Sequence, residues 1–150
     1  MKNKLILTAL LATSALSAQA QVKPEDAIKW RQSAYATMSW SMARIDANLQ
    51  GKYDKEDVLK AATVLQAIAN SGMGALYVPG SDKGKGWVDT RVKPALFTDG
   101  PKVGKIAGDF NKAANELAKA AAAGDAGAVK TSFEAVGGTC KSCHDDYRTK

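Results

Sequence analysis

The sequence predicts an all-α protein in which four helices form an antiparallel up-down-up-down bundle. Four stretches repeat apolar residues about every seven positions, as helices facing a shared core do. No stretch alternates apolar and polar residues with a period of two, and β-branched residues do not cluster, so strands are not expected. The connections after the first and third stretches are short, which makes neighbouring helices antiparallel.

The first helix is expected to begin at Pro24, because proline suits the first helical position, and Glu25 and Asp26 follow in the first turn. We expect Gly51 to end it. One of its inward positions is an arginine, which is unusual for a core face. The inward positions are Ile28, Arg31, Tyr35, Met38, Met42, Ile45 and Leu49.

The other three helices have start and stop signals of their own. The second is expected to follow Asp54 as its N-cap and to stop around residues 72–74. The third is expected to follow Asp99 and to end before Gly124, and the fourth to begin near Asp125. Their inward faces carry Val58, Ala61, Leu65 and Ile68; Val103, Ile106, Phe110, Ala113, Leu117 and Ala120; and Val129, Phe133, Val136, Cys140, Cys143 and Tyr147.

The connection between the second and third helices, from about residue 73 to 98, is long for a compact domain. Such loops usually cover or contact something. In an up-down-up-down bundle, the C-terminal end of the fourth helix lies at the same end as this loop and the N-terminal half of the first helix. We therefore expect the end of helix four to face Arg31, Tyr35 and Met38.

Residues 1–20 have the pattern of a secretory signal peptide. Lys2 and Lys4 precede an apolar run over residues 5–12, and small residues lead to a cleavage site after Ala20. The run is too short to span a bilayer, so we expect residues 21–150 to form one exported, periplasmic domain without a membrane segment. The formal net charge is +6, but the basic residues are dispersed and interleaved with acidic ones, which disfavours nucleic-acid binding.

The motif Cys140-Lys141-Ser142-Cys143-His144 lies close to the C-terminus. On a helix, Cys140, Cys143 and His144 project from one side. Two thiols at this spacing can add to the two vinyl groups of a haem, and the adjacent imidazole can then bind the iron. The pattern therefore predicts one covalent haem c, attached through both cysteines near the C-terminal end of the last helix.

Three other interpretations of this motif are weaker. A structural zinc site needs four nitrogen or sulfur ligands, whereas the chain has two cysteines and one histidine. A thioredoxin-like pair belongs at the start of a helix in a βαβ unit. A simple disulfide between Cys140 and Cys143 leaves His144 unexplained.

His144 is the only histidine, so two axial histidines are excluded. Arg31 and Tyr35 are expected opposite it, but arginine stays protonated and a phenol with a pKa of about 10 is a poor iron ligand. We therefore expect the sixth position to be open or blocked, leaving the iron five-coordinate and high-spin. A sulfur ligand would instead indicate an electron carrier. The candidates are Met38, Met42 and Met73, of which Met38 is the best placed and Met42 is expected in the core.

Residues 23–32 and 137–148, which include the haem motif, resemble cytochrome c′, the class II c-type cytochromes. The resemblance covers the whole mature chain. It implies that His144 is the proximal iron ligand, that the distal face is vacant but shielded, and that the protein is a periplasmic homodimer. It also matches Tyr35 to the distal shielding residue, Met38 to a pocket neighbour, Arg31 to a basic residue near the haem, and Arg148 to a proximal arginine. Tyr35 departs from the more common leucine or phenylalanine.

We expect the protein to bind small diatomic ligands, NO and more weakly CO, and to bind or buffer NO. The alternative is periplasmic electron transfer with a small redox partner. An enzyme that turns over peroxide is disfavoured because no second histidine could act as distal acid or base. For Arg31, a contact to a haem propionate is preferred over a side chain whose head group reaches water.

Overall fold

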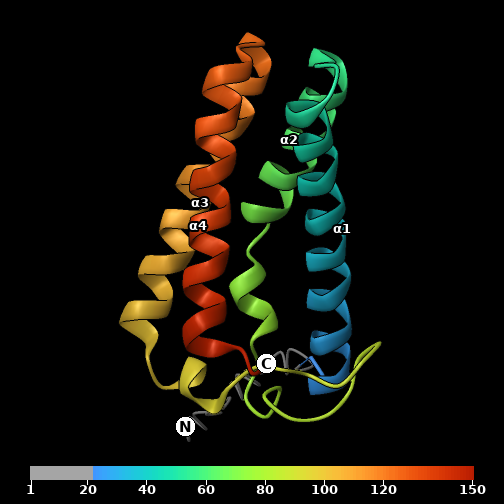
Figure 1. Cartoon of the computed structure of the whole chain (residues 1–150). Helices are drawn as coiled ribbons and strands as arrows, with labels where there is room; N and C mark the ends of the chain where they lie inside the picture. The colour runs from blue at the N-terminus through green and yellow to red at the C-terminus, as the bar shows by residue number, and fades with distance from the viewer. Residues whose placement is uncertain (1–21) are drawn as a thin grey trace, which may run out of the picture.

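The computed structural model describes residues 22–150, and the predicted signal peptide lies outside them. The helices α1 (Pro24–Gln50), α2 (Lys55–Ala69), α3 (Gly100–Ala123) and α4 (Ala126–Tyr147) form a bundle (Figure 1). Helices adjacent in sequence pack side by side and run antiparallel. The prediction of an all-α up-down-up-down bundle is confirmed. Within the described residues, no helix has the length and apolar character needed to cross a membrane.

Two of the helices begin at aspartate caps. Asp54 Oδ1 accepts hydrogen bonds from the backbone N–H groups of Glu56 (2.9 Å) and Asp57 (3.1 Å). Asp125 does the same for Gly127 (2.8 Å) and Ala128 (3.1 Å) at the start of α4. These bonds satisfy N–H groups that have no partner within the helix, so each helix begins where the sequence predicts.

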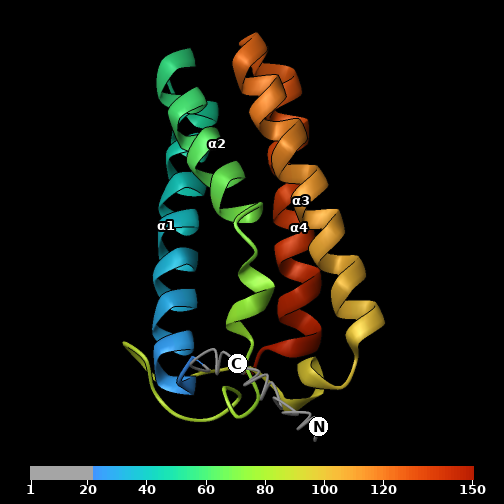
Figure 2. The same ribbon diagram turned by 180° about the vertical axis from the view of Figure 1, so that it is seen from behind.

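Helix α2 ends earlier than the sequence predicts, at Ala69 instead of around residues 72–74. The Asn70 side chain donates from Nδ2 to the Gln66 carbonyl (2.8 Å) and to Asn115 Oδ1 of α3 (3.0 Å). A side chain bonded to the backbone in this way replaces the continuing helical pattern. The chain then makes a single 3-10 turn, η1 (Met73–Leu76), and Figure 2 shows α2 stopping well short of the N-terminal end of α1.

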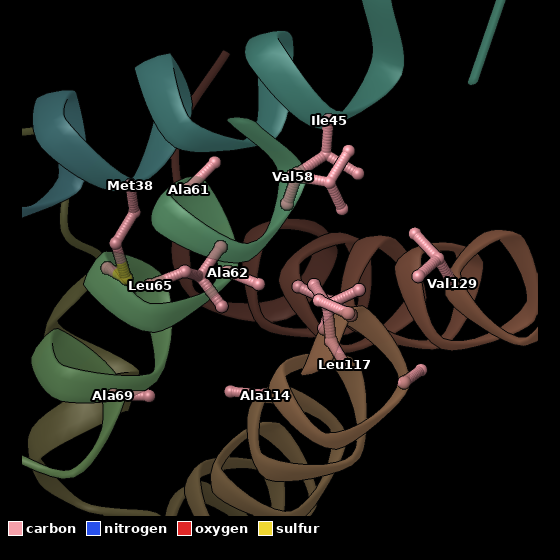
Figure 3. Close-up of a cluster of buried hydrophobic side chains, with 13 residues drawn as sticks. Met38, Ile45, Val58, Ala61, Ala62, Leu65, Ala69, Ala114, Leu117 and Val129 are labelled. Atoms are coloured by element: carbon pink, nitrogen blue, oxygen red, sulfur yellow. The ribbon is translucent and has the colours of Figure 1, made fainter. Parts of the chain in front are cut away.

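The core lies where α1, α2, α3 and α4 meet, and its large side chains come from all four helices (Figure 3). Many of the remaining core positions are alanines, which let α2 and α3 approach closely. The fully buried large residues include Ile45, Val58, Leu65, Leu117, Val129 and Val136. This core is continuous with the haem motif, because Cys140 packs against it.

The ion pair between Arg44 of α1 and Asp57 of α2 should make the stability of the protein depend on pH. Hydrogen bonding from Arg44, and then from Asn48 (2.8 Å), lowers the pKa of the Asp57 carboxyl. A carboxyl whose folded pKa is depressed stabilises the protein above its unfolded pKa, and this stabilisation is lost as the pH falls through the folded pKa. We expect Asp57→Asn to lower the free energy of unfolding near neutral pH and to flatten its decline in acid.

Urea unfolding from about pH 7 to pH 2 would measure this effect. The control is Glu134→Gln, which removes an exposed carboxylate on α4. A pH profile for Asp57→Asn that superimposes on that of the control would contradict the prediction.

Candidate haem-attachment site

Cys140, Cys143 and His144 lie on the last turns of α4, at the end of the bundle that also holds the start of α1 and the long connection (Figure 1). Both cysteines are free and half-buried. The two cysteines and the histidine therefore lie within the last turns of one helix, and the helical spacing predicts that their side chains project from one side.

Burial raises the pKa of the Cys140 thiol. Burial also raises the pKa of the Cys143 thiol, helped by the nearby Cys140 and Asp146. Both groups therefore keep their hydrogen at neutral pH. Addition across a vinyl double bond consumes a sulfur and its hydrogen, and a neutral thiol supplies both.

The His144 imidazole is held in its neutral form. Burial lowers its pKa, and the positive charges of Arg148 and Arg91 lower it further. Nη1 of Arg148 lies 3.4 Å from Nδ1 of His144, while Nε2 has no hydrogen-bond partner among residues 22–150. A neutral imidazole with a free nitrogen is the form that binds a metal.

A hollow of about 510 Å³ opens in the long connection. It is open to solvent, and Cys140, Cys143 and His144 are not among its lining residues. It is lined by Tyr77, Pro79, Gly80, Asp82, Pro94 and Phe97. Burial is the main cause that raises the pKa of Tyr77, and the Cys143 sulfur contributes in the same direction.

These residues fit a haem better than a bare metal ion. Among residues 22–150, no three histidine, cysteine or acidic side chains converge as a metal-ligand cluster. The zinc interpretation therefore has no geometric support. Two free thiols and an imidazole with an unbonded Nε2, close together in sequence on one helix, are the groups that covalent attachment and axial ligation of a haem require.

Arg31 is buried, with 2% of its surface exposed, and its guanidinium binds the long connection. Nη1 donates to the Leu76 carbonyl (3.1 Å) and to Ser81 Oγ (2.7 Å). Nη2 donates to the Ser81 carbonyl and to Thr90 Oγ1 (2.9 Å). The alternative interpretation required the guanidinium to reach water, and in this structure it does not. Its contact with a haem propionate stays a prediction.

The two other predicted residues of α1 differ in their surroundings. Tyr35 is 41% exposed, and its hydroxyl lies 2.7 Å from that of Tyr77. Met38 is buried in the core, and Figure 3 shows its side chain pointing toward Leu65 of α2. The roles of Tyr35 as distal shield and of Met38 as pocket neighbour remain predictions.

Sequence reasoning missed the residues of the connection that support the end of α4. Lys93 donates from Nζ to the carbonyls of Asp145 (3.2 Å) and Asp146 (3.0 Å), and from its backbone N–H to that of Tyr147 (2.8 Å). A lysine at this position satisfies carbonyls that the helix leaves free. The length of the connection indicated such a contact, but no local pattern identified Lys93.

Comparison with known proteins assigns the family. Residues 26–148 match the family model described as Cytochrome C'. The chain belongs to the cytochrome c′ family. Such proteins carry covalent haem c and are not enzymes, so this chain is a haem protein with one haem attached through Cys140 and Cys143.

The relatives match most of the chain. Cytochrome c′ of Rhodocyclus tenuis is 60% identical over 129 residues, which are 85% of this chain and 97% of that protein. A solved cytochrome c′ described as having an unusual ligand-controlled dimer dissociation is 56% identical, with a TM-score of 0.84, covering 87% of this chain and 100% of that one.

More distant relatives have been solved with gases bound. A variant of cytochrome c′ from Alcaligenes xylosoxidans in complex with nitric oxide is 31% identical, with a TM-score of 0.76, covering 86% of this chain and 98% of that one. Another variant of the same protein was solved with carbon monoxide bound.

The contacts of Arg31 predict a large effect on stability. Arg31→Met removes four hydrogen bonds and leaves the oxygens of buried Ser81 and half-buried Thr90 without these donors, so the free energy of unfolding should fall by about 2–4 kcal/mol. Urea unfolding of the holoprotein measures it. The control is Lys119→Met, which removes an exposed positive charge on α3. Equal stability of Arg31→Met and this control would contradict the prediction.

Proposed function

We propose that this protein is a periplasmic cytochrome c′ whose haem iron is bound by His144 and by no protein atom on the opposite face. In this proposal the iron is five-coordinate and high-spin, and it binds diatomic gases, above all NO and more weakly CO. The physiological role is to bind or buffer NO. Export follows from the predicted signal peptide, with cleavage after Ala20, and is typical of the family.

One observation carries the proposal: the only imidazole of the chain lies beside the two thiols, while the best-placed methionine is buried in the core. Met38 points toward Leu65 (Figure 3) and has 7% of its surface exposed. For its sulfur to bind the iron, it would have to leave that packing. This supports a vacant sixth position over the electron-carrier alternative.

The residues around the site would act by holding and shielding. When bound, the haem supplies an iron that forms strong bonds to NO and CO. Desolvation first, and then the charges of Arg148 and Arg91, lower the pKa of His144 and favour the neutral imidazole that can bind metal. On the opposite side the bulky Tyr35 ring would limit access, so that only ligands with a strong iron bond displace it.

The gas complexes of the Alcaligenes xylosoxidans variants support the proposed ligands. We extend the proposal to a homodimer, supported by the relative with ligand-controlled dimer dissociation. In this chain Trp30 and Trp40 of α1 are 51% and 58% exposed. Large exposed aromatic side chains of this kind are enriched at protein interfaces.

Absorption and electron paramagnetic resonance spectra test the proposal directly. The purified ferric and ferrous protein should give high-spin spectra, and the ferrous form should bind NO and CO. A low-spin ferric spectrum with a sulfur-to-iron charge-transfer band would instead establish methionine ligation and favour electron transfer. Failure of the ferrous form to bind NO would overturn the proposed function.

A paired variant tests the attachment residues. Cys140→Ser with Cys143→Ser should leave the haem extractable by acidified organic solvent, because no thioether bond can form. The matched control is Ser142→Ala, which alters the residue between the cysteines and should retain covalent haem. Retention of covalent haem by the double-serine variant would contradict the assignment.

A further inference from the structure

Tyr77, which no sequence pattern singled out, meets the predicted distal shield directly. It follows the last residue of η1, and its hydroxyl lies 2.7 Å from the hydroxyl of Tyr35 on α1. At this distance the two phenols share a hydrogen bond. The two residues are 42 positions apart in the chain, so the long connection brings them together.

Tyr77 is held in place from several sides. The guanidinium carbon of Arg31 lies 4.9 Å from the centre of the Tyr77 ring, and the Phe97 ring meets it edge-on at 6.4 Å between centroids. Its backbone N–H donates to the Gly74 carbonyl (3.1 Å). The neighbouring Leu76 carbonyl accepts from Arg31. Tyr77 is therefore a fixed point against which a second side chain can be held.

Tyr35 lacks such support of its own. Its ring is 41% exposed on the surface of α1, and the only side-chain hydrogen bond it makes within residues 22–150 is the one to Tyr77. A phenol has an ordinary pKa of about 10, so both hydroxyls keep their protons at neutral pH and the hydrogen bond between them persists. The orientation of Tyr35 therefore depends on Tyr77.

We propose that Tyr77 is a positioning residue that holds the Tyr35 ring over the distal side of the haem and so sets how readily a gas reaches the iron. This inference rests on the proposed function, because it requires an open sixth position. A ligand that enters must move Tyr35, and moving Tyr35 breaks its hydrogen bond to Tyr77. The connection, through Tyr77, therefore contributes to the barrier against ligand binding.

The first test is the rate of CO binding to the ferrous holoprotein after flash photolysis. Tyr77→Phe keeps the ring and its contacts with Arg31 and Phe97 but removes the hydroxyl. Loss of one hydrogen bond should favour the displaced position of Tyr35 by about threefold to tenfold, and CO association should accelerate by a similar factor. Tyr35→Phe breaks the same bond, so the double variant should be no faster than the faster single variant.

The matched control is Tyr53→Phe. Tyr53 belongs to the connection between α1 and α2 at the other end of the bundle, and its buried hydroxyl has no hydrogen-bond partner among the described residues. Removing that hydroxyl should leave CO association unchanged. The comparison separates a specific effect at the distal side from the general effect of losing a tyrosine hydroxyl.

A second readout does not depend on the gas. In urea unfolding of the holoprotein, Tyr35→Phe and Tyr77→Phe should each change the unfolding equilibrium constant, and their effects should be non-additive by about threefold to tenfold. Suppose that this coupling is present but that the rate of CO association is the same in Tyr77→Phe and Tyr53→Phe. The hydrogen bond between Tyr35 and Tyr77 is then only structural, and the inference fails.

The two proposals fail in different ways. A wild-type ferrous protein that does not bind CO overturns the proposed function and with it the role of Tyr77. A wild-type protein that binds CO, together with a Tyr77→Phe variant of unchanged rate, overturns the role of Tyr77 alone. Additive effects of Tyr35→Phe and Tyr77→Phe on CO association would also overturn it.

Discussion

The burial of one arginine controls much of the end of the bundle that carries the haem motif. Arg31 lies on the core-facing side of α1 with almost none of its surface exposed, and it forms no ion pair with a carboxylate of residues 22–150. A buried cation needs hydrogen-bond acceptors, and it finds them on Leu76, Ser81 and Thr90 of the long connection. Because these acceptors span fifteen positions of that segment, a single side chain holds much of the connection against α1.

The short α2 makes room for this arrangement. Because α2 ends at Ala69, it does not reach the end of the bundle that holds the start of α1, and η1 with the connection lies beside α1 there (Figures 1 and 2). Helices α1 and α4 make few direct contacts with each other, unlike the other neighbouring pairs. At this end of the bundle, the connection therefore takes the place that a longer α2 would occupy beside α1.

The connection also supports the helix that carries the haem motif. Lys93 binds the last carbonyls of α4, and Tyr147 donates from its hydroxyl to Asp99 Oδ2 (2.7 Å). The same segment thus contacts Arg31 on α1 and the C-terminal turn of α4. His144 on α4 and Tyr35 on α1 are therefore held relative to each other by one continuous stretch of chain that contacts both helices.

The sequence alone determined the helices, the caps at Asp54 and Asp125, the bundle topology and the haem motif, because each depends on residues a few positions apart. Periodicity and N-capping act within one or two turns, and Cys140, Cys143 and His144 share one face by helical spacing.

The tertiary structure decided the end of α2, the partners of Arg31, and the pairing of Tyr35 with Tyr77. Arg31 and Ser81 are 50 positions apart, and many serines, threonines and carbonyls could have accepted its hydrogen bonds. Only the folded path of the connection selects among them, since no local pattern encodes which distant groups will meet.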